Sequence, residues 1–174
     1  MNYTELLKLM SDRCSCRAYS TKSISEEDLS KLLEASKLAP TAHNNQPQRI
    51  YVVKSEEGKA KLMKDFKFNF NAPCYLVFGY NVDESWKNPL DNNKDSGEVD
   101  ISIVMTHIML MAEELGLSTC WIGYIEPEAI RKNLGIPENI KIIGAMTLGY
   151  HKEGSMPSKS HTIRRNNEDL IKFL

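Results

Sequence analysis

This sequence lacks long apolar runs, dense cysteine motifs and an excess of charge of either sign. Its longest apolar run, residues 101–112, is interrupted by Ser102, Thr106 and His107, and it is too short to span a bilayer. Lysine plus arginine (22) nearly balance aspartate plus glutamate (23), so the formal net charge is -1. Because no chain-wide attraction to nucleic acid or to an anionic membrane follows, neither is predicted as a partner.

The four cysteines are too scattered for a disulfide framework. Cys14 and Cys16 form a lone C-x-C pair, whereas Cys74 and Cys120 lie far downstream, and no paired zinc motif or C-x-x-C motif is present. The sequence also lacks H-E-x-x-H, a phosphate-cradling glycine loop and a recognisable catalytic triad. We therefore expect no metal site and a reduced, cytoplasmic protein, since the N-terminus does not resemble a secretion signal.

Helical and strand patterns alternate along 174 residues, a length that suits one domain. Helices are expected near residues 4–10, 25–39, 55–66, 98–115 and 127–135, and strands near 49–54, 74–80, 118–124 and 140–150. Thr4 and Ser25 are the expected N-caps, residues 81–97 an expected mobile loop or lid, and the tail from His151 an expected polar, basic segment. No repeat or linker divides residues 1–174, so we predict a single α+β domain.

The helix expected at residues 98–115 is apolar on two sides. One stripe contains Ile101, Val104, Met105, Ile108, Met109, Ala112 and Leu115, and another side carries Ile103, Leu110 and Met111. A helix with two apolar sides needs two partners, and we expect these to be its own sheet and a second subunit.

In residues 13–17, Arg-Cys-Ser-Cys-Arg, the two arginines share a face in a helix, and Arg13, Ser15 and Arg17 share one in an extended segment. Two guanidinium groups beside a hydroxyl suit a phosphate. The alternative is a solvated basic turn, with Cys14 and Cys16 as small packed side chains. A metal or redox role for the two cysteines is the weaker interpretation, because neither has a partner at the usual spacing.

Residues 40–48 form a polar loop in which Thr41, His43, Asn44 and Gln46 offer many hydrogen-bonding groups. Amide side chains suit the edge of a heterocycle that carries alternating N–H and C=O groups. The alternative is a polar surface turn. His43 and His107 are candidate bases without an evident catalytic partner.

Two further segments contain candidate site residues. Trp121 is either a pocket wall or a core residue, and Gly123 allows a ligand to approach the backbone closely. In the tail, a second basic patch consists of Lys159, His161, Arg164 and Arg165.

Taken in order, these segments resemble the flavin-dependent nitroreductase family over nearly the whole chain. The matching positions are Arg13, Ser15 and Arg17; Ala39, Pro40, Thr41, Asn44, Gln46 and Pro47; residues 71–80; residues 109–124; and Leu148–Gly149–Tyr150 followed by Arg164 and Glu168. The departures are Cys14 for an arginine, Gln48 for a tryptophan, Ser118 for a glycine, and Asn166–Asn167 for Pro-Leu.

The resemblance implies an α+β fold: a nitroreductase-like α/β sandwich with a central mixed or antiparallel sheet, flanking helices and an intertwined homodimer. It implies one FMN in each interface cleft. The implied cofactor-binding residues are Arg13, Cys14, Ser15, Arg17 and Arg164 toward the phosphate and ribityl chain, Pro40, Thr41, Asn44 and Gln46 from the other subunit toward the ring, and Trp121, Ile122 and Gly123 at the ring's other edge. Lys159 and His161 are alternatives to Arg164.

The implied activity is an oxidoreductase that passes a hydride from NADH or NADPH through flavin N5 to an electron-poor small molecule such as a nitroaromatic or quinone, in a ping-pong cycle. The flavin carries the chemistry, and Arg17 is a candidate for electrostatic support. The alternatives are a flavin-fragmenting or dehalogenating enzyme of the same fold, a non-catalytic flavin-binding redox sensor, and a structural dimerisation protein. The sequence leaves open the physiological acceptor and the choice among NADH, NADPH and a ferredoxin.

Overall fold

The computed structural model describes residues 2–174 and contains a four-stranded antiparallel sheet with the strand order β1-β2-β6-β5. The strands are β1 (Gln48–Val53), β2 (Cys74–Asn81), β5 (Ser118–Ile122) and β6 (Ile140–Gly149). β2 and β6 are the central pair and are buried along almost their whole length, because aliphatic and aromatic side chains cover both of their faces.

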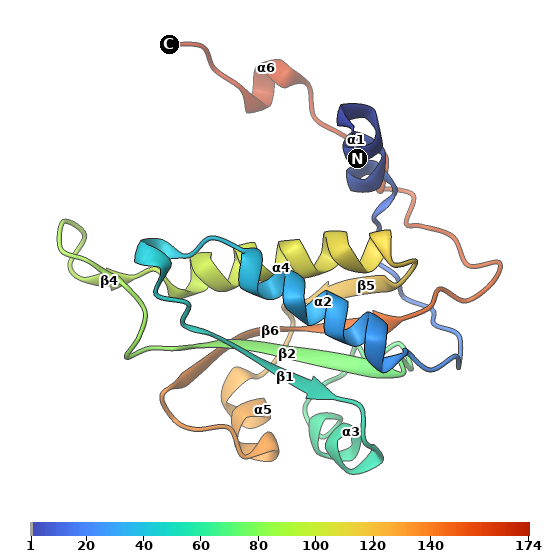
Figure 1. The fold of residues 1–174 in the computed structure, drawn as a ribbon, viewed down its shortest axis with the longest axis horizontal. Coiled ribbons are helices and arrows are strands. Elements are labelled where there is room, and N and C mark those ends of the chain that lie inside the picture. Colours follow the sequence, from blue (N-terminus) through green and yellow to red (C-terminus); the bar gives the residue numbers. More distant parts are fainter. Residues whose placement is uncertain (1) are drawn as a thin grey trace.

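Helices cover both faces of the sheet (Figure 1). α2 (Glu26–Leu38) and α4 (Gly97–Glu114) lie on one face, and α3 (Glu56–Leu62) and α5 (Pro127–Leu134) lie on the other. α1 (Tyr3–Asp12) contacts α4, and the short α6 (Asn167–Leu170) belongs to a C-terminal segment on the same side of the sheet. This arrangement confirms the predicted α+β sandwich and fixes its sheet as antiparallel.

Local sequence signals predicted several helix ends correctly. The hydroxyl of Ser25 accepts a hydrogen bond from Asp28 N–H (3.0 Å) at the start of α2, as expected for an N-cap. Gly135 ends α5 in the left-handed conformation (φ 68°), which glycine adopts without steric cost.

One local expectation is wrong, and two segments contain structure that was not predicted. The N-cap of α1 is Asn2 rather than Thr4, because Asn2 and Glu5 form a reciprocal capping box. Residues 81–97, the expected loop or lid, contain a small hairpin in which β3 (Lys87–Asn88) pairs with β4 (Lys94–Asp95). The polar tail also contains the short α6, which the sequence analysis did not predict because it has no apolar periodicity.

The two apolar sides of α4 have different surroundings. Ile101, Val104 and Ile108 face the sheet and are fully buried. On the other side Ile103 is only half-buried and Val99 is 63% exposed, so this chain leaves that side partly uncovered. Among residues 2–174, none of the helices combines the length and the hydropathy that a membrane crossing requires.

Candidate functional site

The segment after α1 lies beside the start of β5 in an extended conformation. Ser15 forms a parallel bridge with Thr119, and Cys16 N–H donates a hydrogen bond to the Thr119 carbonyl (2.8 Å). Of the two geometries open to residues 13–17, the extended one is therefore present.

Side chains of this segment line a cavity of about 390 Å³. Residues 158–164 of the C-terminal segment contribute to its wall, so residues about 150 positions apart in the sequence meet here. The lining residues are Arg13, Cys14, Ser15, Arg17, Ser158, Ser160, His161 and Arg164. A second cavity of about 360 Å³ shares Ser15, Arg17 and Ser158 with the first.

Within the part of the chain that the structure describes, the arginines of this cavity form no salt bridge. Among the ion pairs within residues 2–174, none involves Arg13, Arg17 or Arg164. By contrast, Arg49 pairs with Glu84 at 2.6 Å. Arg17 and Arg164 donate hydrogen bonds to nearby backbone carbonyls. Guanidinium groups outside salt bridges, beside serine hydroxyls in a concave site, suit an anion with several acceptor oxygens, such as a phosphate group.

The carboxyl group of Glu113 lies close enough to interact with the charge of Arg13. Burial and Asp12 raise the pKa of Glu113, whereas Arg13, His151 and His161 lower it, and the net direction is upward. In the folded protein Glu113 thus binds a proton more readily than in the unfolded chain, so the stability of the fold decreases as pH rises from the unfolded to the folded pKa.

We expect Glu113→Gln to raise the melting temperature at neutral pH, because the substitution removes the cost of a partly buried charge. The gain should vanish below about pH 4, where the carboxyl is protonated in both states. Thermal denaturation of both proteins across this pH range measures the effect, with Glu114→Gln at the exposed neighbouring position as the control. A gain that persists unchanged at acid pH would contradict this explanation.

The two cysteines of the segment differ in position. Cys16 is 1% exposed in the core, and its thiol donates to the Ala18 carbonyl (3.1 Å). Cys14, in contrast, is half-buried and is one of the residues that line the cavity. Burial raises the pKa of both thiols, and Glu113 raises that of Cys14 further. Because the thiolate is the reactive form, a redox role for the pair is disfavoured.

We expect the double variant Cys14→Ser, Cys16→Ser to keep the flavin colour and the turnover of the parent protein, because serine preserves size and the hydrogen bond to Ala18. Flavin absorbance and steady-state rates of the two purified proteins test this. A loss of turnover with an intact fold would reinstate a redox role for the cysteines.

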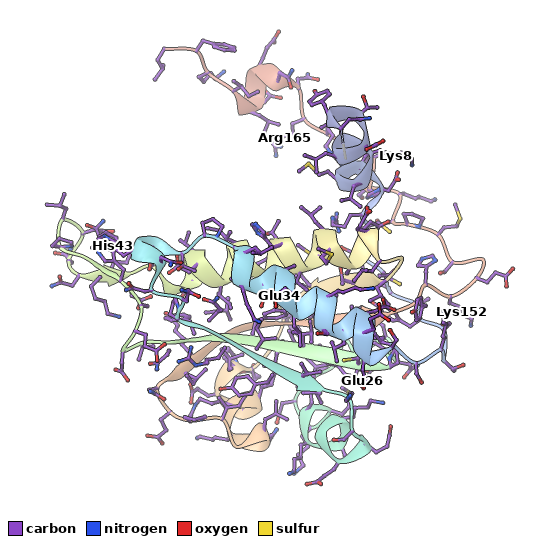
Figure 2. The ribbon with its side chains drawn as sticks, viewed as in Figure 1. Lys8, Glu26, Glu34, His43, Lys152 and Arg165 are labelled. Carbon is purple, nitrogen blue, oxygen red and sulfur yellow. The ribbon has the colours of Figure 1, made fainter. Side chains whose placement is uncertain are left out.

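The polar loop at residues 40–46 lies at the opposite end of α4 from this cavity. It contains a short 3₁₀ turn, η1 (Ala42–Asn44), and the backbone of Ala42 contacts Asp100 in the first turn of α4. Glu113, whose pKa Arg13 lowers, is in the last turn of α4. At a rise of 1.5 Å per residue, Glu113 lies about 20 Å from Asp100 along the helix axis. Figure 2 accordingly shows His43 near one end of α4 and Lys8 of α1 beyond the other end.

The end of β5 offers mainly backbone to a ligand. Trp121 is half-buried and packs against the core on the α4 side of the sheet. Its Nε1 lies close to Gly144, 2.9 Å from the position that a Cβ would take there. Ile122 is 6% exposed in the opposite layer, and Gly123 is exposed. Gly123 lies four residues beyond Thr119, the residue that pairs with Ser15. Four residues span about 13 Å along a strand.

Other candidates lie outside these regions. Lys159 is exposed and is not among the residues that line the cavity, so of the tail alternatives the structure brings His161 and Arg164 to it. His107 bonds through Nδ1 to the Ile103 carbonyl (3.0 Å) within α4. Ser158 and Ser160 were not identified from the sequence, since isolated serines in a polar tail carry no pattern. Residues 2–174 hold no group of three or more His, Cys, Asp or Glu side chains arranged to bind a metal ion.

Comparison with known proteins identifies the family. The nitroreductase family profile matches residues 10–67 and 63–150. A protein of Archaeoglobus fulgidus, provisionally named an NADH dehydrogenase/NAD(P)H nitroreductase, is 37% identical over 156 residues, covering 86% of this chain and 87% of its own. The chain belongs to the nitroreductase family, which confirms the resemblance seen in the sequence.

Two further relatives extend the comparison. The FMN reductase [NAD(P)H] of Bacillus subtilis is 25% identical over 168 residues, 87% of this chain and 68% of that protein. The crystal structure of a nitroreductase family protein from Clostridium difficile superposes with a TM-score of 0.88 at 34% identity, covering 99% of this chain and 98% of that one. A provisionally named nitroreductase from Exiguobacterium sibiricum, solved in complex with FMN, shares the fold (TM-score 0.82, 23% identity, 100% and 98% covered).

Proposed function

We propose that residues 1–174 form a single FMN-binding domain of an NAD(P)H-dependent oxidoreductase that reduces an electron-poor small molecule such as a nitroaromatic or a quinone. The observation that carries the proposal is the arginine-lined cavity, whose Arg13, Arg17 and Arg164 take part in none of the salt bridges among residues 2–174. The names of the family relatives, NAD(P)H nitroreductase and FMN reductase, support the same cofactor and donor.

The residues present fit an FMN phosphate. Arg13, Arg17 and Arg164 supply positive charge, and Ser15 supplies a hydroxyl beside the backbone of Cys14. When bound, FMN accepts a hydride from NADH or NADPH and passes it to the acceptor. Arg17 contributes a positive charge that favours electron uptake by the bound group.

The remaining candidate residues interact with the ring system. Thr41, Asn44 and Gln46, with Pro40 before them, present hydroxyl, amide and backbone groups to it. The backbone at Trp121, Ile122 and Gly123 forms another edge of the site, because the side chain of Ile122 is buried and that of Trp121 packs against the core. No acid–base side chain is required in this assignment, since hydride transfer belongs to the cofactor.

The functional site is completed by a second copy of the chain. Within one chain the polar loop and the arginine cavity lie at opposite ends of α4, so they meet only if two copies of α4 run antiparallel to each other. The uncovered side of α4 supports this packing, and so do exposed apolar side chains on α1 and in the tail, including Leu7, Met10, Ile171 and Phe173. We therefore propose a homodimer.

The purified protein tests the function directly. It should be yellow, it should bleach when mixed anaerobically with NADH or NADPH, and its colour should return on addition of a nitroaromatic or a quinone. A colourless dimer that rejects added FMN would exclude the enzyme. A yellow protein that neither donor bleaches would indicate a flavin-binding sensor or a different reductant, such as a ferredoxin.

Two further expectations remain proposals. A cytoplasmic location rests on four cysteines that are all free thiols in the structure. The flavin-fragmenting or dehalogenating alternative is separated by product analysis, because hydride transfer leaves the flavin intact after many turnovers.

A further inference from the structure

The polar loop at residues 40–46 has an unusual backbone. His43, Asn44 and Gln46 have φ values of 53°, 55° and 52°, in the left-handed region that residues other than glycine seldom occupy. Such residues persist only where the surrounding structure holds them.

One buried carboxylate connects this loop to α4. Asp100 is 2% exposed, and its Oδ1 accepts a hydrogen bond from Ala42 N–H (2.9 Å). Its Oδ2 accepts from the hydroxyl of Ser96 (2.7 Å). Both oxygens thus have a donor, and the charge lies in the first turn of α4, where the helix dipole favours an anion.

The hydroxyl of Ser96 is used in this contact instead of in helix capping. Ser96 is the N-cap residue of α4, yet its side chain makes no capping hydrogen bond. A second bond, from Gln46 N–H to Thr41 Oγ1 (3.0 Å), closes the loop on itself. The loop is therefore a closed unit joined to α4 through Ala42 and Asp100.

We propose that Asp100 is a positioning residue that sets the conformation of residues 41–46 for contact with the flavin ring of the partner subunit. The inference rests on the proposed function, because it requires that this loop faces the ring. Asp100 itself lies beneath the loop, and it acts by fixing Ala42 and, through Ala42, the left-handed residues that follow.

The structure contains a reporter of the loop that does not need the cofactor. The rings of His43 and Trp86 stack with centroids 5.3 Å apart and planes at 15°. Trp86 lies beside the β3–β4 hairpin and is one of two tryptophans in the chain. The emission of Trp86 is obtained by subtracting, from the emission spectrum of each protein, the spectrum of the same protein carrying Trp86→Phe.

The test compares FMN-free proteins and loaded enzymes. In the FMN-free protein, Asp100→Ala should shift Trp86 emission to that of His43→Ala, because the loop is released from α4. Asp100→Asn should restore the emission of the parent, since the amide can accept from Ala42 and donate to Ser96. In the loaded enzyme, Asp100→Ala should lower kcat about tenfold at unchanged flavin content, and Asp100→Asn should recover most of it.

Glu98→Gln is the matched control, because Glu98 is another acid of the first turn of α4 but pairs with Lys141 (2.7 Å) instead of the loop. It should change neither emission nor kcat. If Asp100→Ala does not fold, Ser96→Ala removes one of the two contacts, and a partial shift of Trp86 emission is expected.

Parent-like Trp86 emission in folded Asp100→Ala, or in Ser96→Ala where Asp100→Ala does not fold, overturns the inference. A parent-like kcat in Asp100→Ala also overturns it, and both results leave the oxidoreductase function intact. If the parent protein fails to bind FMN, the proposed function is wrong and Asp100 has no flavin ring to position the loop for. The Trp86 emission of the FMN-free proteins still shows whether Asp100 holds the loop, so the two failures are distinguished.

Discussion

Replacing Arg17 with alanine is expected to weaken FMN binding by about tenfold and to slow turnover. A hydrogen bond to a charged group contributes about 1.5–3 kcal/mol, which corresponds to a factor of roughly 10 to 150 in a dissociation constant. We expect the lower end, because Arg17 is exposed to solvent and its charge is screened. Titration of the FMN-free protein with FMN, followed by flavin fluorescence, measures the change.

Arg165→Ala is the control for this substitution. Arg165 is also an exposed arginine, and it neighbours Arg164, but it does not line the cavity. Its removal should leave the FMN dissociation constant unchanged. Higher salt should also narrow the difference between the parent and Arg17→Ala, because screening weakens the contact. Equal dissociation constants for the parent and Arg17→Ala would contradict the assignment of Arg17 to the phosphate.

Mixing two inactive variants is expected to restore activity. The first variant, Arg17→Ala with Arg13→Ala, has a defective cavity and an intact loop. The second, Asn44→Gly with Gln46→Gly, has an intact cavity and lacks the loop amides, while glycine tolerates the left-handed backbone at both positions. A mixed dimer joins the intact cavity of the second variant to the intact loop of the first, so each mixed dimer has one complete site.

The experiment requires that the subunits exchange, which co-expression with two different affinity tags achieves. Tandem purification isolates the mixed dimer, and its turnover is compared with that of each parent variant. If each site were built within one chain, both sites of the mixed dimer would be defective and no activity would return. A mixed dimer of the correct size that has no activity would contradict the sharing of sites between subunits.

Local features were readable from the sequence because they depend on neighbouring residues. The Ser25 cap, the Gly135 stop and the apolar runs of β2 and β6 each follow from side chains within a few positions. The capping box of α1 was missed because Asn2 and Thr4 are both plausible caps, and the choice depends on the position of Glu5 three residues after Asn2.

The sequence by itself determined the α+β class, the family and the candidate residue types, since these follow from periodicity, composition and ordered motifs. The tertiary structure decided which of those residues meet. Ser15 reaches Thr119, Arg13 and Arg17 share a cavity with Arg164, and Asp100 holds Ala42, although these partners are 58 or more positions apart. Such contacts depend on the order of strands in the sheet and on the course of the tail, and no short stretch of sequence specifies either.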